Sequence, residues 1–256
     1  MNNILAIAHK ELKSYFSTPI AYVVIGFFAF LWGWFFYAAL MFFNQQSLQS
    51  GFGGPEGVSM NQQLIRPLFL NASVIMLFVL PLITMRTYSE EKRSGTIELL
   101  LTSPLTDFQI IVGKFVGALA LYAAMLAVTI VHMALLFSWG NPAPEWRPVL
   151  TGYLGLLLMG GCFISVGLLI SSLTKNQIVS GMVTFAVFLM LWVINWTASF
   201  AGPTMQNVLN YLSITDHFDD FTKGILDTKH LIYYFSVISF GLFLTARSVD
   251  TERWKG

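Results

Sequence analysis

The sequence predicts an all-α polytopic membrane protein with six transmembrane helices, and two observations carry this prediction. First, 55% of the 256 residues are hydrophobic and only 11% are charged, whereas about a quarter of the residues in soluble domains are charged. Second, six apolar stretches approach the roughly 20 helical residues that cross about 30 Å of hydrocarbon. We expect one transmembrane domain, residues 1–256, with spans at 20–43, 68–85, 115–139, 149–173, 178–200 and 231–246.

Two of these stretches have distinctive features. The sixth is the shortest, and it crosses a bilayer if its helix begins earlier, near His230, or if the bilayer thins around it. The fourth contains the small-residue string "MGGCFISVG", Met159–Gly167, which predicts close contact with a neighbouring helix.

Charge and cysteine content exclude several classes of protein. The formal net charge is +1, so the chain has no basic field that would attract nucleic acid. Cys162 is the only cysteine, which excludes an internal disulfide, and we interpret it as an apolar filler.

The segment before the first span, residues 1–19, has the pattern of a helix that lies in the inner membrane interface. Pro19 suits a break between this helix and the span. An ordinary basic flank is the alternative interpretation. On a helical wheel the apolar residues fall within an arc of about 120°, and they are Ile4, Leu5, Ala8, Leu12, Tyr15 and Phe16.

The distribution of Lys and Arg predicts the orientation, because positively charged short loops stay in the cytoplasm. With six spans, one side collects Lys10, Lys13, Arg86, Lys92, Arg93, Lys114, Lys175, Arg247, Arg253 and Lys255. The other side collects only Arg66, Arg147, Lys223 and Lys229. We therefore expect a multi-pass protein of the inner (plasma) membrane with both termini in the cytoplasm.

The loop between the second and third spans, residues 86–107, stands out by its charges. We expect residues 86–94 to continue the second span into water as a charged helix that ends at Gly95. A short amphipathic helix over 96–102 follows, held crosswise, and the string "TSP" ends it. Thr106 and Gln109 match a capping box that opens the third span. Such a crosswise helix predicts a docking surface, and the alternative is a loop whose apolar face simply lies on the membrane.

The same loop resembles that of the ABC-2 transporter permeases. The string is "LPLITMRTYSEEKRSGTIELLLTSPLTDFQIIVGK", Leu80–Lys114, and the resemblance extends over nearly the whole chain through the interface helix, the six spans and the longer outer loop before the sixth. The tail from Ser213 to Leu244 resembles the subgroup that contains the gliding-motility-associated permease.

The resemblance implies a membrane permease, an exporter, that works with two cytoplasmic ABC ATPase subunits and a second permease copy or paralogue. The chain itself has no G-x-x-x-x-G-K-[ST] loop, so ATP and Mg are expected on the ATPase and no cofactor in this chain. The 96–102 helix is then the coupling helix. The expected coupling residues are Glu90, Glu91, Arg93, Gly95, Thr96, Ile97, Glu98, Leu100 and Leu101.

The spans contain few polar groups. We expect Lys114 to extend to the inner surface, which leaves His132 as the candidate intramembrane polar site. A neutral histidine bonded to a neighbouring helix is the favoured interpretation of His132. No Asp or Glu lies in mid-membrane, which argues against a proton-driven carrier. An intramembrane enzyme would need paired catalytic groups that the sequence does not show, and a non-transporting membrane anchor of a larger envelope machine stays open as an alternative.

The outer loops carry weaker predictions. Phe218, Phe221, Ile225 and Leu226 have helical spacing, and the resemblance implies short outer helices before the sixth span. The cluster Asp216, His217, Asp219 and Asp220 could ligate a hard cation, but an ordinary oxygen-rich surface is favoured, and we expect no metal. The polar, Gly-rich first outer loop suits contact with an extracytoplasmic accessory protein.

Overall fold

The computed structural model describes residues 2–50, 59–101, 104–141, 143–198 and 202–253. Within these ranges the regular structure is helical and no strand occurs. The elements are α1 (Asn2–Ser17), α2 (Pro19–Ser50), the π-helical turn η1 (Asn61–Ile65), α3 (Arg66–Thr84), α4 (Ser89–Ser94), α5 (Thr96–Leu101), α6 (Asp107–Trp139), α7 (Trp146–Leu173), α8 (Gln177–Ala198), α9 (Pro203–Leu212), α10 (Ile214–Thr222) and α11 (Thr228–Arg253).

Six helical segments of the described part are long and apolar enough to cross a membrane, as the sequence predicted. They are Pro19–Leu48, Asn61–Ser94, Asp107–Trp139, Trp146–Leu173, Gln177–Ile194 and Thr228–Thr251. The last begins before His230, so the sixth span is not short. Residues 51–58, in the Gly-rich loop that we expected on the outer side, lie outside the described residues, as do residues 102–103 and 199–201.

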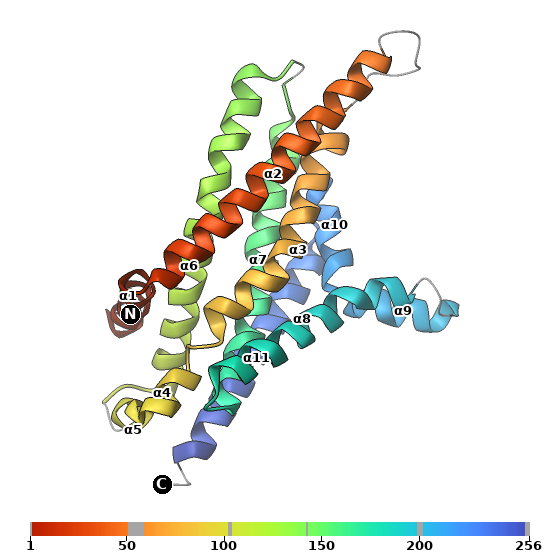
Figure 1. Cartoon of the computed structure of the whole chain (residues 1–256). Coiled ribbons are helices and arrows are strands. Elements are labelled where there is room, and N and C mark those ends of the chain that lie inside the picture. Colours follow the sequence, from red (N-terminus) through yellow and green to blue (C-terminus); the bar gives the residue numbers. More distant parts are fainter. Residues whose placement is uncertain (1, 51–58, 102–103, 142, 199–201, 254–256) are drawn as a thin grey trace.

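The bundle is built around α3 and α7, which are the most buried of the six, whereas α2 and α8 are the least buried. Figure 1 shows α4, α5 and the C-terminus at one end of the bundle, and the far ends of α2 and α6 at the other. The outward faces of α2 and α8 carry large exposed side chains such as Phe30, Trp34 and Met190. In a membrane protein, such faces meet lipid or another subunit.

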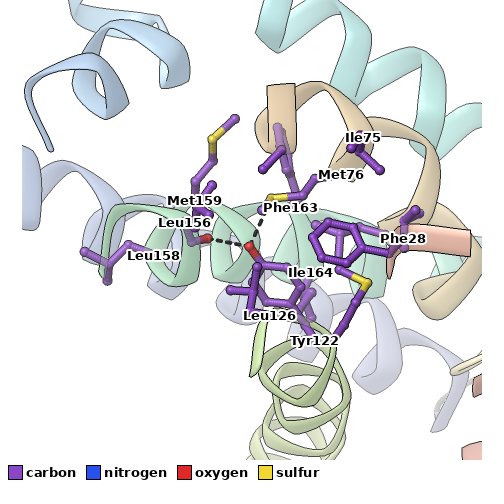
Figure 2. Close-up of a cluster of buried hydrophobic side chains, with 14 of the residues drawn as sticks. Phe28, Ile75, Met76, Tyr122, Leu126, Leu156, Leu158, Met159, Phe163 and Ile164 are labelled. Atoms are coloured by element: carbon purple, nitrogen blue, oxygen red, sulfur yellow. Dashed lines mark hydrogen bonds between the residues drawn. The ribbon is translucent and has the colours of Figure 1, made fainter. Parts of the chain in front are cut away.

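Glycines in α7 let other helices approach closely, as the small-residue string predicted. A Cβ atom on Gly160 would clash with the Tyr122 ring of α6, and one on Gly167 would clash with Thr84 of α3. Figure 2 shows the result at Tyr122, whose hydroxyl donates to the Leu156 carbonyl at 2.8 Å and also contacts Met76 Sδ at 3.0 Å. The buried hydroxyl is thus satisfied within an apolar core.

The N-terminal helix α1 packs on the start of α6. Figure 1 views α1 almost along its axis while α2 runs across the view, so these two helices meet at a large angle. Cβ atoms on Gly113 and Gly117 of α6 would lie 2.7 Å from Ile7 and 2.8 Å from the Glu11 side chain. The buried side of α1 therefore includes Ile7 and Glu11, while Leu5, which the helical wheel placed in the apolar arc, is 60% exposed.

One local prediction was wrong. The second span does not continue as an unbroken charged helix to Gly95, because α3 ends at Thr84 and residues 85–88 form turns before α4 begins at Ser89. The physical reason is Ser171 of α7, whose hydroxyl forms hydrogen bonds with the backbone groups that the break leaves outside a regular helix.

Candidate functional site

The charged loop forms a sharp corner between two short helices, α4 and α5. Gly95 joins them with φ of 73°, in the left-handed region that glycine enters at no steric cost. The hydroxyls of Ser94 and Thr96 lie 2.9 Å apart across the corner. We call residues 89–101 the α4–α5 corner.

The predicted coupling residues divide into exposed and buried groups. Arg93, Thr96 and Glu98 are exposed, and Ile97 is partly buried against the hydrophobic core. The side chains of Leu100 and Leu101 lie outside the described residues, although their backbone belongs to α5. The corner therefore presents a polar, charged outer surface while Ile97 faces inward.

The two glutamates of α4 have different partners. Glu90 pairs with Arg86 one turn earlier, with 2.9 Å between Nη2 and Oε2, and its side chain is 46% exposed. Such an exposed pair contributes little to stability. Glu91 is only 18% exposed and pairs instead with Lys114 of α6.

Lys114 is the centre of a buried polar network. Its Nζ donates to Glu11 Oε1 and Glu91 Oε1, each at 2.8 Å, and to the Thr87 carbonyl at 3.0 Å. The side chain is 1% exposed, and Nζ lies 5.0 Å from the centroid of the Tyr88 ring. An ammonium group has three protons to donate, and all three have acceptors here. The network joins α1, α6 and the α4–α5 corner.

The sequence prediction for Lys114 was wrong. We expected its side chain to extend to the inner surface, but it is buried between two carboxylates. A buried ammonium requires partners of opposite charge, and Glu11, 103 residues away, was not identified as one. The usable signal was Glu91 in the loop that leads into the third span, whereas no local signal pointed to Glu11.

Ser171 of α7 holds the break between α3 and α4. Its hydroxyl accepts from the backbone N–H groups of Tyr88 at 3.0 Å and Ser89 at 3.1 Å, and it donates to the Met85 carbonyl at 3.1 Å. Buried backbone groups outside a regular helix need such partners. One fully buried serine therefore fixes the direction in which α4 leaves the bundle.

Tyr15 adds a second connection from α1 to this break. Its hydroxyl donates to the Ile83 carbonyl at 3.1 Å and lies 3.3 Å from the Thr87 hydroxyl. Burial raises the pKa of Tyr15 to about 12, so the hydroxyl keeps its proton and its role as donor. A cavity of 260 Å³ beside it, between α1 and α4, is lined by charged groups that include Lys10 and Arg86.

The start of α6 is fixed as predicted. The Thr106 hydroxyl accepts from Gln109 N–H at 3.3 Å, and the Gln109 side chain accepts from Thr106 N–H at 3.4 Å. This is a complete capping box. Asn3 of α1 donates to the same Gln109 side chain at 3.3 Å, so the cap also contacts the N-terminal helix.

His132 does not form the hydrogen bond that the sequence favoured. It lies between α6 and α2, where its ring centroid is 4.9 Å from that of Phe36 in an edge-on arrangement. Its Nδ1 atom is buried without a hydrogen-bond partner among the described residues. The side chain is thus held by aromatic packing.

Two short helices, α9 and α10, precede α11, at the place where short helices before the sixth span were expected. Asp219 pairs with Arg66 at 2.7 Å and with Lys223 at 2.6 Å, while Asp220 accepts from His230 at 2.9 Å. These carboxylates are engaged by protein cations. No group of three or more potential metal ligands occurs within the described ranges.

The fold and these sites define a multi-pass membrane protein with a charged corner anchored at one end. Residues 5–247 match the model of the ABC-2 family of transporter proteins, and the chain belongs to that family. A relative in Escherichia coli K12, "Probable multidrug ABC transporter permease YbhR", is 30% identical over 150 residues, which cover 56% of this chain and 39% of that protein. The relative of the same name in Escherichia coli O157:H7 matches equally. The chain matches less than half of these relatives' length.

Proposed function

We propose that this chain is the permease subunit of an ATP-driven exporter, and that its α4–α5 corner docks on a separate cytoplasmic ATPase. Membership of the ABC-2 family supports a transmembrane transporter subunit. One observation supports the docking site above all. The corner exposes a polar and charged surface at Arg93, Thr96 and Glu98, and behind this surface the buried Glu91–Lys114 ion pair attaches it to the bundle. A surface that receives force needs a rigid attachment to the helices that move.

The anchors explain how a displacement of the corner would reach the membrane helices. Lys114 joins Glu91 in α4 to α6 and α1, and Ser171 joins the backbone around Ser89 to α7. Separating a buried ion pair leaves an uncompensated charge and costs about 3–5 kcal/mol. A push on α5 therefore moves α1, α6 and α7 with it.

The proposed coupling surface has an exposed and a positioning part. Arg93, Thr96 and Glu98 contact the ATPase, and Gly95 sets the angle between α4 and α5. Glu91 acts from behind the surface through Lys114. The full set is Glu90, Glu91, Arg93, Gly95, Thr96, Ile97, Glu98, Leu100 and Leu101.

The assembly that this function requires contains two permease units, identical or paralogous, and two ATPases that bind ATP and Mg. This chain is then non-catalytic and needs no cofactor of its own. Both termini and the corner lie in the cytoplasm and the chain resides in the inner membrane, which the Lys and Arg distribution supports. Contacts with membrane lipid, and with an accessory protein on the outer side, complete the proposed set of partners.

The cargo we propose is amphipathic or lipidic. The Escherichia coli relatives carry a multidrug designation, and the large aromatic side chains on the spans suit apolar ligands. The tail Ser213–Leu244 supports placement in the gliding-motility-associated subgroup, which concerns the assembly more than the cargo.

The test is copurification of the ATPase with tagged protein from native membranes in mild detergent. We expect a P-loop ATPase in equal amount, and we expect Glu98→Lys and Gly95→Pro to lower its recovery or its turnover. Proline fixes φ near −65°, which is incompatible with the 73° at Gly95. Glu145→Lys is the matched control, because Glu145 is also exposed but precedes α7 at the opposite end of the bundle.

Unchanged ATPase recovery and turnover in both corner variants would refute the docking site. A stable complex in which ATP causes no change in the accessibility of the outer side would instead favour the anchor of a larger envelope machine.

A further inference from the structure

A cavity of 390 Å³ lies between α3, α8 and α10, far from the α4–α5 corner. Figure 1 shows α8 leaving the bundle obliquely toward α9, while α10 returns toward α3. We call this space the outer cavity. Its volume lies within the range of about 300–1,000 Å³ that is typical of small-molecule sites.

The outer cavity is negatively charged. Among the residues that the structure describes, its lining contains one guanidinium, Arg66, and two carboxylates, Asp216 and Asp219. Arg66 donates to Asp219 Oδ1 from Nη2 at 2.7 Å and from Nε at 3.2 Å. Lys223 pairs with Asp219 at 2.6 Å and with Asp220 at 3.4 Å, so these two cations and two carboxylates balance one another. The Asp216 carboxylate forms no hydrogen bond or ion pair with any described residue. Within the described ranges, Asp216 is therefore the lining carboxylate without a direct ionic partner, and the nearest cation that acts on it, Lys223, is engaged by Asp219 and Asp220.

Three aromatic side chains belong to the lining: Trp192, Trp196 and Phe218. The rings of Trp192 and Trp196 in α8 have centroids 5.1 Å apart and planes at 59°. Leu70, Val74 and Phe218 add apolar surface. Indole faces attract cations as well as apolar groups, so this lining is suited to a ligand that is both positively charged and apolar.

Asp216 also has an electrostatic reason to accept a cation. Burial and the neighbouring carboxylates of Asp219 and Asp220 raise the pKa of Asp216 above its ordinary value. Both effects disfavour the ionised carboxylate, and a bound positive charge would offset them.

We infer that the outer cavity binds a monovalent lipophilic cation, with Asp216 as its counter-charge and Trp192 and Trp196 around its apolar body. Calling this ligand a transported substrate rests on the proposed function. The binding site itself does not, because all of its residues belong to this chain.

The test is equilibrium binding of tritiated tetraphenylphosphonium to the purified full-length chain in detergent, without ATPase. We expect saturable binding that Asp216→Asn weakens roughly tenfold, as the loss of one nearby opposite charge predicts. Trp192→Ala should weaken binding about fivefold through loss of a cation–π contact, and Asp216→Glu should restore most of the affinity. Asp227→Asn is the matched control, since Asp227 is an exposed aspartate of the same outer region that pairs with Lys229.

Two binding results would overturn the inference. Equal affinity of Asp216→Asn and the unchanged chain, in preparations with the same apparent Tm, would overturn the inference. Tetraphenylborate, an anion of similar shape, should bind at least tenfold more weakly, because Asp216 would repel it. Equal binding of the two ions would mean partition into apolar surface and would also overturn the inference. Failure of ATPase copurification would leave this result untouched, so the two proposals fail separately.

Discussion

Lys114 and Glu91 form a buried ion pair with 2.8 Å between Nζ and Oε1, although 23 positions separate them in the chain. The pair joins α6 to the α4–α5 corner, and Glu11 completes it from α1. Two carboxylates share one ammonium, so neither glutamate alone is essential for neutralising Lys114. The loss of Lys114 should therefore destabilise the protein more than the loss of either glutamate.

Removing the cation should be more damaging than removing one carboxylate. We expect Lys114→Met to destabilise the protein by about 3–5 kcal/mol, since it leaves two buried carboxylates without a counter-charge. Glu91→Gln should cost less, about 1–2 kcal/mol, because Lys114 keeps its pair with Glu11. Apparent Tm in detergent measures both, and an equal loss in the two variants would contradict the shared-ammonium arrangement. The double variant should lose less than the sum of the single losses.

Ser171 should contribute more to the stability of the protein than a single small side chain usually does. We expect Ser171→Ala to cost about 1–3 kcal/mol, because two buried N–H groups, those of Tyr88 and Ser89, lose their acceptor. Ser165→Ala is the control on the same helix, since among the described residues the Ser165 hydroxyl bonds only the carbonyl of Cys162 within α7. If ATPase coupling is measured as well, Ser171→Ala should lower it and Ser165→Ala should not. Equal behaviour of the two variants would remove Ser171 from its positioning role.

The elements that the sequence could predict are those with a local signal. The number of spans follows from apolar stretches long enough for a bilayer, and the α6 cap follows from Thr106 and Gln109 alone. Gly95 marked the corner because its backbone conformation is a property of one residue. In each case the residues that make the signal are close together in the chain.

The residues that sequence reasoning missed depend on contacts between distant segments. Lys114 near the end of an apolar stretch is compatible both with reaching the surface and with burial, and only the packing of α1 on α6 brings Glu11 to it. The break after Thr84 has no glycine or proline at its own positions, 85–88. It exists because Ser171, more than 80 residues later, satisfies its backbone. No local pattern contains that information.

Close packing at Gly160 gives a prediction about the core. We expect Gly160→Ala to destabilise the protein by about 1–3 kcal/mol, because the added methyl group overlaps the Tyr122 ring in a close-packed interior. Gly26→Ala in α2 is the control, since no described atom outside its chain neighbours and its own helical backbone lies within 4 Å of its Cβ position. There the better helix propensity of alanine should be neutral or stabilising by up to about 1 kcal/mol. Opposite shifts in apparent Tm are expected, and a tolerated Gly160→Ala would show that α6 and α7 are less closely packed.

His217 of α10 and His230 of α11 are in direct contact. His217 Nε2 lies 3.0 Å from the Tyr211 carbonyl, so it carries the proton, and Nδ1 of neutral His217 is an acceptor. His230 Nδ1 lies 2.6 Å from this Nδ1 atom, and His230 Nε2 lies 2.9 Å from Asp220 Oδ2. The two rings, with centroids 4.9 Å apart, join α10 to α11. The surrounding titratable groups are Tyr211, Asp216, Asp219, Asp220, Lys223, Lys229, Tyr233 and Tyr234.

Acid should weaken this connection through His217. Burial lowers the pKa of His217 below its ordinary value of 6.5, and the adjacent His230 lowers it further. Because the pKa of His217 is lower in the folded protein, the unfolded chain takes up the proton first as the pH falls. The stability that neutral His217 contributes is therefore fully present above pH 6.5, and it is lost as the pH falls through the pKa of the folded state. Apparent Tm measured from about pH 7.5 to about pH 5 should therefore decrease, and His217→Gln should flatten that decrease. His9→Gln, at an exposed histidine of α1, should keep the slope of the unchanged protein. A slope that survives in His217→Gln would assign the acid sensitivity to other groups.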